Sequence, residues 1–254
     1  MLSYKSILLA VLSVSSLASA LPIRREVPQE HSHEDILTVV RTNLNLNNPD
    51  GIVDPVFSLL GNAAAKQGLG KIADPDCLQQ AVADQAFTNA KAAGDVAGQV
   101  NALIFRALER NSGSVGAKSN LCTSITAVNP EIAAVQQHQD PASDGAAAAN
   151  KAVVLALAKQ IAAVGGDPQD ALKSGTFAPG TIGDTTAKGN SCDDANDPNG
   201  CINTQNLRVD DATAEEITAA VGGVSSGSSS SSNSTGASAS STATAGGDAA
   251  ASGM

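Results

Sequence analysis

Apolar residues recur every three or four positions along much of this 254-residue chain, which is the spacing of one face of an α-helix. The longest stripe predicts helix over residues 74–110. Gly94-Asp95 interrupts this stretch, because a glycine ends one helix and an aspartate caps the next. The stripe consists of Leu78, Val82, Ala86, Ala90, Ala93, Ala97, Val100, Ile104 and Leu108.

A second long helix is predicted over residues 143–164, where Gly165-Gly166 stops it. Shorter helices are expected over 36–44 and 56–63, and another starts at the capping box formed by Thr213 and Glu216. Four further helix starts place an Asx residue before a proline, whose missing N–H costs nothing in the first turn. They are Asp54-Pro55, Asp74-Pro75, Asn129-Pro130 and Asp167-Pro168.

The fold class predicted is all-α, an Ala-rich bundle of about six to eight helices. Strand-like alternation is nearly absent, and only 2% of residues are aromatic, with no Trp. The buried volume must therefore come from small aliphatic side chains, which suit closely packed helices. A long irregular segment over 175–211 is expected to wrap the bundle, and such a segment needs a covalent tie.

Four cysteines supply that tie. In an exported chain they are expected to form two disulfides, for which three pairings exist in principle. Cys192 and Cys201 lie nine positions apart across a turn-rich loop and are expected to pair. Cys77 is then left for Cys122.

The first 20 residues predict a secretory signal peptide, with Lys5, an apolar run over 7–17 and a final Ala18-Ser19-Ala20. The run is too short to span a membrane, and no transmembrane segment is predicted later. Arg24-Arg25 is a possible dibasic processing site, which makes 21–25 a possible pro-segment and places the mature start near Glu26.

Residues 222–254 contain 12 Ser and 3 Thr, with Asp248 the only charge, and are predicted to be a disordered tail. Such hydroxyl-rich stalks are substrates for O-glycosylation, and Asn233 begins the N-glycosylation sequon Asn233-Ser234-Thr235. No GPI anchor is expected, because the tail lacks an apolar run. The helical domain is accordingly assigned to residues 26–221.

The formal net charge is −10. Removing residues 1–25 leaves 12 basic and 25 acidic residues, a formal net charge of −13. Nucleic-acid binding is excluded on this ground, because phosphate backbones require clustered Lys and Arg. The charge also disfavours adhesion to anionic membranes.

The loop between Cys192 and Cys201 is rich in oxygen ligands of the type that Ca²⁺ selects. These are Asp193, Asp194, Asn196, Asp197 and Asn199. The loop lacks the EF-hand register and its closing Glu, so a set of tight turns inside a disulfide is the preferred interpretation. Calcium is expected to bind weakly at most.

His31 and His33, followed by Glu34-Asp35, could chelate a transition metal. A terminus is a poor scaffold, so adventitious or no binding is expected, with Ser32 as N-cap of the first helix. His138 is expected at a polar helix end, in contact with solvent or the helix dipole. No cofactor is predicted.

No catalytic motif is present in the sequence: there is no G-x-S-x-G, H-E-x-x-H, P-loop or dinucleotide fingerprint. The paired carboxylates Asp193-Asp194 and Glu215-Glu216 are adjacent on surface segments, whereas a glycosidase needs two acids that face each other. The chain is therefore expected not to be an enzyme.

Taken together, the leader ending Leu21-Pro22-Ile23-Arg24-Arg25, the Ala-rich body and the hydroxyl-rich stalk resemble fungal small secreted cell-wall and cell-surface proteins. The segments that carry the likeness are residues 129–136, 175–180 and 192–201. The resemblance covers most of residues 31–221 and brings no catalytic residue with it.

The resemblance implies an extracellular, wall-associated, non-enzymatic protein with a glycosylated stalk. Its partner could be a cell-wall polysaccharide or an unidentified extracellular molecule. The alternative is a diffusible secreted binding protein, including an effector directed at a host.

Overall fold

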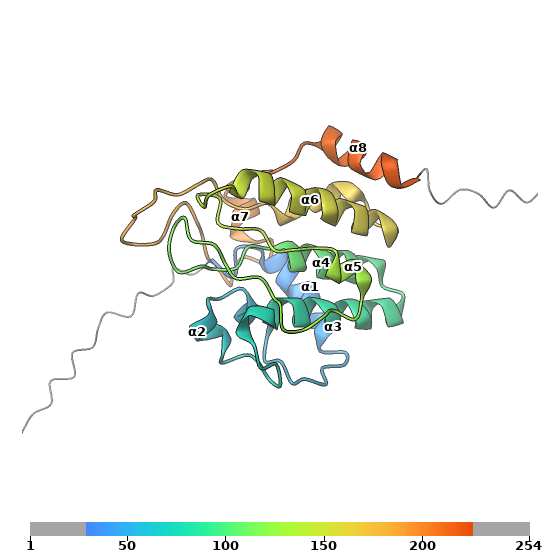
Figure 1. Cartoon of the computed structure of the whole chain (residues 1–254). Helices are drawn as coiled ribbons and strands as arrows, with labels where there is room; N and C mark the ends of the chain where they lie inside the picture. Colours follow the sequence, from blue (N-terminus) through green and yellow to red (C-terminus); the bar gives the residue numbers. More distant parts are fainter. Residues whose placement is uncertain (1–28, 226–254) are drawn as a thin grey trace, which may run out of the picture.

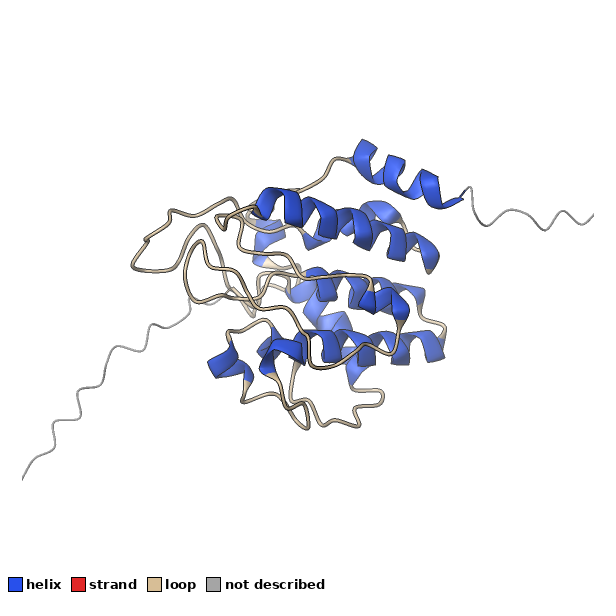
Figure 2. Ribbon diagram, in the orientation of Figure 1, coloured by secondary structure: helices blue, strands red, loops and turns tan. Residues whose placement is uncertain are grey.

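The computed structural model describes residues 29–225, and within them the chain is helical (Figures 1 and 2). The helices lie in tiers. Figure 1 shows α3 below α1 and α4, with α6 above these and α8 outermost. The long connections gather at one end of the bundle, where residues 110–128 and 175–200 lie. The all-α prediction is confirmed, and in the described part the one β-contact is a bridge between Thr176 and Val209.

The elements follow one another in the order shown in Figure 1. The α-helices are α1 (Glu34–Leu44), α2 (Asn62–Ala65), α3 (Leu78–Ala93), α4 (Val96–Ala107), α5 (Pro130–Ala133), α6 (Ala146–Ala163), α7 (Cys201–Thr204) and α8 (Ala214–Ser225). The 3₁₀ helices are η1 (Pro55–Ser58), η2 (Pro75–Cys77) and η3 (Pro168–Ser174).

The core lies around α4, which packs on α1, α3 and α6, and it is built mainly from aliphatic side chains, as the composition predicts. Its largest fully buried members include Phe87, Phe105, Leu37, Leu103, Leu157 and Ile161. Alanines on α3 and α4 are fully buried between the larger side chains, so these helix axes can approach closely.

The corner between α3 and α4 forms as the sequence predicts. Gly94 adopts the left-handed conformation (φ 70°) that ends α3, and its N–H donates to the carbonyl of Lys91. Asp95 then caps α4, because its carboxylate accepts a hydrogen bond from the Gly98 N–H at 2.9 Å. The capping box of α8 also forms, with Thr213 and Glu216 accepting from each other's backbone N–H groups.

All four Asx-Pro helix starts exist, but none opens a long helix by itself. Three open the 3₁₀ helices η1, η2 and η3, whose caps accept from the N–H two residues on, and Asn129 opens the single turn α5. The side-chain amide of Asn129 donates to the Asp84 carboxylate of α3 at 2.7 Å, and the Asn129 side chain makes no capping hydrogen bond to α5. The prolines therefore set the first turn, and tertiary packing decides how far it extends.

Helix α6 is long and apolar enough, by length and composition alone, to cross a membrane. Val154, Leu157 and Ile161 are fully buried and belong to the core cluster. The helix packs on α4, η3 and α8, and Lys151 pairs with Glu216 of α8 at 2.7 Å.

Both expected disulfides are formed, Cys77–Cys122 and Cys192–Cys201. The first ties the connection between α4 and α5 to the start of α3. The second closes the loop that precedes α7. Segment 175–211 is irregular as expected, apart from α7, which the sequence analysis did not predict.

Two boundaries differ from the sequence analysis. The N-cap of α1 is His33 rather than Ser32, because the Ser32 hydroxyl meets the His33 ring nitrogen Nδ1 at 3.1 Å instead of a backbone N–H of the first turn. Helix α8 continues to Ser225, past the domain end expected at residue 221. The predicted signal peptide, pro-segment, most of the tail and the Asn233 sequon lie outside the described residues.

Candidate functional site

The carboxylates of the loop between Cys192 and Cys201 make separate hydrogen bonds and do not converge on one point. The Asp194 carboxylate accepts from the Asn196 N–H at 2.9 Å, and the Asp197 carboxylate accepts from the Asn199 N–H at 3.1 Å. Both are the local turns that the sequence analysis preferred. Asp193 instead points away from this pair, toward the segment before α1.

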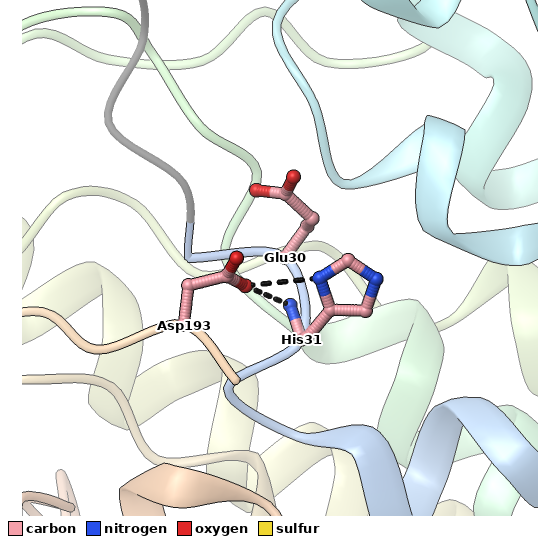
Figure 3. Close-up of side chains that lie close together, drawn as sticks. All are labelled: Glu30, His31 and Asp193. Carbon is pink, nitrogen blue, oxygen red and sulfur yellow. Dashed lines mark hydrogen bonds and ion pairs between the residues drawn. The ribbon is translucent and has the colours of Figure 1, made fainter. Parts of the chain in front are cut away.

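Asp193 meets His31, 162 positions earlier in the chain, and Glu30 lies beside them (Figure 3). Asp193 Oδ1 accepts from the His31 backbone N–H at 2.8 Å and lies 3.0 Å from the ring nitrogen Nδ1. One donor atom from each of the three side chains lies within 4.8 Å of the others. In the described part of the chain, no other three His, Cys, Asp or Glu side chains come together in this way.

The two segments are held together by backbone contacts next to this cluster. The Ile202 N–H donates to the Ser32 carbonyl at 3.2 Å. Gly200 has φ +78°, and a Cβ placed there would lie 2.6 Å from the same carbonyl oxygen. The close approach therefore requires glycine at this position, and the adjoining disulfide fixes both ends of the loop that carries Asp193.

His33 does not join His31. Its side chain is buried, with Nε2 3.1 Å from the Gly175 carbonyl. Burial lowers the pKa of His33 to about 4, so the ring is neutral and Nε2–H donates to that carbonyl. The two histidines and Glu34 therefore do not form the chelate that was considered from the sequence, since Glu34 accepts from Arg41.

His138 lies in the interior, so the expectation of a polar helix end is wrong. Its Nδ1 is 2.6 Å from the Ala107 carbonyl, and its Nε2 faces Asp211 Oδ2 at 3.5 Å. Burial lowers the pKa of His138 to about 4, and burial with the nearby Asp210 charge raises the pKa of Asp211 to about 6. Because His138 is flanked by polar residues in the sequence, the local pattern did not predict that its side chain is buried.

Glu109 follows α4 and lines a small polar cavity of about 40 Å³ together with Asp140 and Gln29. Burial, reinforced by the Asp140 charge, raises the pKa of Glu109 to about 8. A cavity of this size has room for about three water molecules. It can therefore hydrate the carboxyl group.

No protein-family model, no curated protein and no solved structure matches the chain. The Glu30, His31 and Asp193 cluster offers one imidazole and two carboxylates at the surface, which are metal ligands and hydrogen-bond acceptors.

Proposed function

We propose that this chain is a secreted, non-enzymatic cell-wall or cell-surface protein of fungal type, which displays its helical body and carries a glycosylated stalk. The observation that carries the proposal is the pairing of all four cysteines as disulfides. Structural disulfides form and persist in oxidising, extracellular surroundings and are rare in the cytosol.

The sequence at both ends supports the same location. Residues 1–20 have the order of a secretory leader, and residues 226–254 continue from α8 as a hydroxyl-rich stretch typical of glycosylated stalks. Helix α8, which precedes this stretch in the sequence, is the outermost helix of the body in Figure 1. The expected partner is a wall polysaccharide or another extracellular molecule.

The non-enzymatic part of the proposal has its support in the cavity beside Glu109. A carboxyl group with a raised pKa next to a second acid is the usual sign of acid–base chemistry. Here the space beside Glu109 is about 40 Å³, which favours hydration of the carboxyl group over the binding of a substrate.

The proposal is tested by separating cells of a producing fungus into wall and medium and measuring the intact mass of each pool. We expect most of the protein in the wall fraction, starting near Glu26 and heavier than its sequence by sugar residues. Deleting residues 226–254 should move it to the medium. Asn233→Gln is the matched control, because it removes only the N-linked site and should leave the wall pool unchanged. An unmodified mass, or a wall pool unaffected by the deletion, contradicts the stalk.

A second function, a diffusible binding protein, is favoured by one surface observation. Leu121, Ile125 and Val128 are 45%, 40% and 85% exposed on the segment that Cys122 ties to α3. Exposed apolar side chains mark a contact surface where they adjoin one another, and these three lie within eight residues of one tethered segment. Recovery of the full chain from the medium, with saturable binding that Val128→Ser weakens, would favour this function over display at the wall.

A further inference from the structure

We propose that Glu30, His31 and Asp193 bind one divalent transition-metal ion of the Zn²⁺ class, through one imidazole nitrogen and two carboxylate oxygens (Figure 3). This inference goes beyond the proposed surface role and does not depend on it. It rests on the distances within the cluster, on its charge and on the way in which the fold holds its two segments.

The distances already suit two neighbouring ligands of one ion. Zinc lies about 2.0–2.2 Å from nitrogen and oxygen ligands, so two ligands at angles of about 90–110° are about 3.0–3.4 Å apart. His31 Nδ1 and Asp193 Oδ1 are 3.0 Å apart. An ion can therefore replace the shared hydrogen between them, with the ring proton moving to Nε2. The ligand atoms of the cluster lie within 4.8 Å of one another, so a Glu30 oxygen must move toward the other two by at most about 1.5 Å to share the ion.

The charge of the cluster favours a cation. Neither Glu30 nor Asp193 forms an ion pair with Lys or Arg among the described residues, and the His31 ring is the side chain that Asp193 contacts there. Some other acids among the described residues do have cationic partners, such as Asp54 with Arg41 and Glu216 with Lys151. A divalent ion would supply the positive charge that the cluster lacks.

The cluster is held in place without the ion. Asp193 follows Cys192 of the disulfide, and its carboxylate also accepts from the His31 backbone N–H, so it keeps its orientation when the ring moves. The Ile202–Ser32 hydrogen bond fixes the neighbouring turn. Most of the ordering that a binding site requires has therefore been done by folding.

The donor set selects the class of ion. Calcium takes six to eight oxygen ligands, whereas this cluster offers three donors, one of them an imidazole nitrogen. Imidazole with carboxylates suits Zn²⁺, Cu²⁺ or Ni²⁺, and three protein ligands leave a position for water. Calcium should therefore not compete with zinc at this site.

The test is titration of the purified full-length secreted protein, without a histidine tag, with ZnCl₂ in a calorimeter at pH 7. We expect one saturable site whose affinity falls at least tenfold in His31→Ala and in Asp193→Asn, and which millimolar Ca²⁺ leaves unchanged. Asp194→Asn is the matched control, since it removes the same charge one residue away and should retain the site.

Thermal unfolding of the same variants distinguishes the loss of the metal site from the loss of the fold. Zinc should raise the melting temperature of the parent and of Asp194→Asn but not of His31→Ala, and circular dichroism should show equal helix content in all three. The proposal is overturned if zinc does not bind, if His31→Ala binds as tightly as the parent, or if Asp194→Asn loses as much affinity as Asp193→Asn.

Discussion

At the scale of single residues, the contact between His138 and Asp211 requires a proton between its two facing atoms. His138 donates from Nδ1 to the Ala107 carbonyl, which leaves Nε2 with a lone pair. Asp211 Oδ2 faces it at 3.5 Å, and neither atom has another partner. A proton on the Asp211 carboxyl group satisfies both atoms at once, in agreement with its raised pKa.

This arrangement predicts a pH effect that Asp211→Asn removes. The folded pKa of Asp211, about 6, lies above the ordinary value of 3.8, so its stabilisation is complete below about pH 4 and is lost as the pH rises through 6. The amide mimics the protonated acid. We expect the variant to match the parent at about pH 3.5, where Asp211 is protonated in both the folded and the unfolded state, and to be the more stable protein at pH 8, by urea unfolding at both values. Asp144→Asn removes an exposed carboxylate and should not change the pH dependence. A variant that loses stability equally at both pH values would contradict the shared proton.

Gly200 predicts the second effect at this scale. Gly200→Ala combines a left-handed backbone (φ +78°) with a Cβ 2.6 Å from the Ser32 carbonyl. Gly183→Ala has a similar backbone (φ +86°) with nothing within 4 Å of the new Cβ. We expect Gly183→Ala to cost about 1 kcal/mol of unfolding free energy from strain alone, and Gly200→Ala about 1–3 kcal/mol more from the clash. Chemical denaturation of both variants measures the difference, and equal losses would show that the loop yields freely.

Local patterns could not reveal the contacts that matter most at this scale. His31 and Asp193 are 162 positions apart, and each stands in a stretch whose composition predicts a turn or a terminus. His138 stands among glutamines, yet its backbone N–H and its ring both reach the Ala107 carbonyl. Inward orientation of a polar side chain depends on the packed tertiary structure, which short-range periodicity does not encode.

At the scale of elements, the sequence predicts starts and stops better than lengths. Gly94-Asp95 and Thr213 with Glu216 lie where the chain turns, because their chemistry acts within one helical turn. The Asx-Pro pairs begin single turns, because extension depends on burying an apolar face against other helices. The two disulfides also belong to this scale, and the spacing of the cysteines was sufficient to predict them.

The disulfides should contribute unequally to stability. Chain-entropy arguments give about 4 kcal/mol for the loop of 45 residues closed by Cys77–Cys122 and about 2.5 kcal/mol for the loop of nine closed by Cys192–Cys201. We therefore expect the double alanine variant of the first pair to unfold at lower urea concentration than that of the second. The reverse order would mean that the short loop supports more of the fold than its length implies.

At the scale of the whole molecule, the small core is accompanied by buried polar groups. Arg106 is 1% exposed and donates to the side-chain carbonyls of Gln136 and Gln137 at 3.0 Å. Burial, with Arg110 nearby, lowers the pKa of Arg106 to about 10. Asp84 accepts from the backbone of Val128 and from Asn129. With 2% aromatic residues, the body closes its loops by such hydrogen bonds as well as by apolar packing.

Four titratable side chains with shifted pKa values determine how the free energy of unfolding varies with pH. The pKa of Glu109 is raised to about 8 and that of Asp211 to about 6, so both stabilise the fold at low pH and lose this effect as the pH rises through those values. The pKa values of His33 and His138 are lowered to about 4, so their stabilisation is complete above about pH 6.5 and falls as the pH drops toward 4. The opposing slopes nearly cancel between about pH 4.5 and 6, where the free energy of unfolding should form a plateau.

Above pH 6.5 the histidines no longer compensate, and Glu109 alone lowers stability, by at most about 1.4 kcal/mol for each pH unit up to its pKa near 8. Urea unfolding at intervals from pH 4 to 9 measures this profile. Glu109→Gln keeps a neutral polar side chain beside Asp140 and the small cavity. It should flatten the alkaline side and replace the plateau between about pH 4.5 and 6 by a rise, and it should leave the profile below about pH 4.5 unchanged. A parent protein most stable at pH 8, or an alkaline decline that persists in Glu109→Gln, would show that this carboxyl group does not determine the alkaline side of the profile.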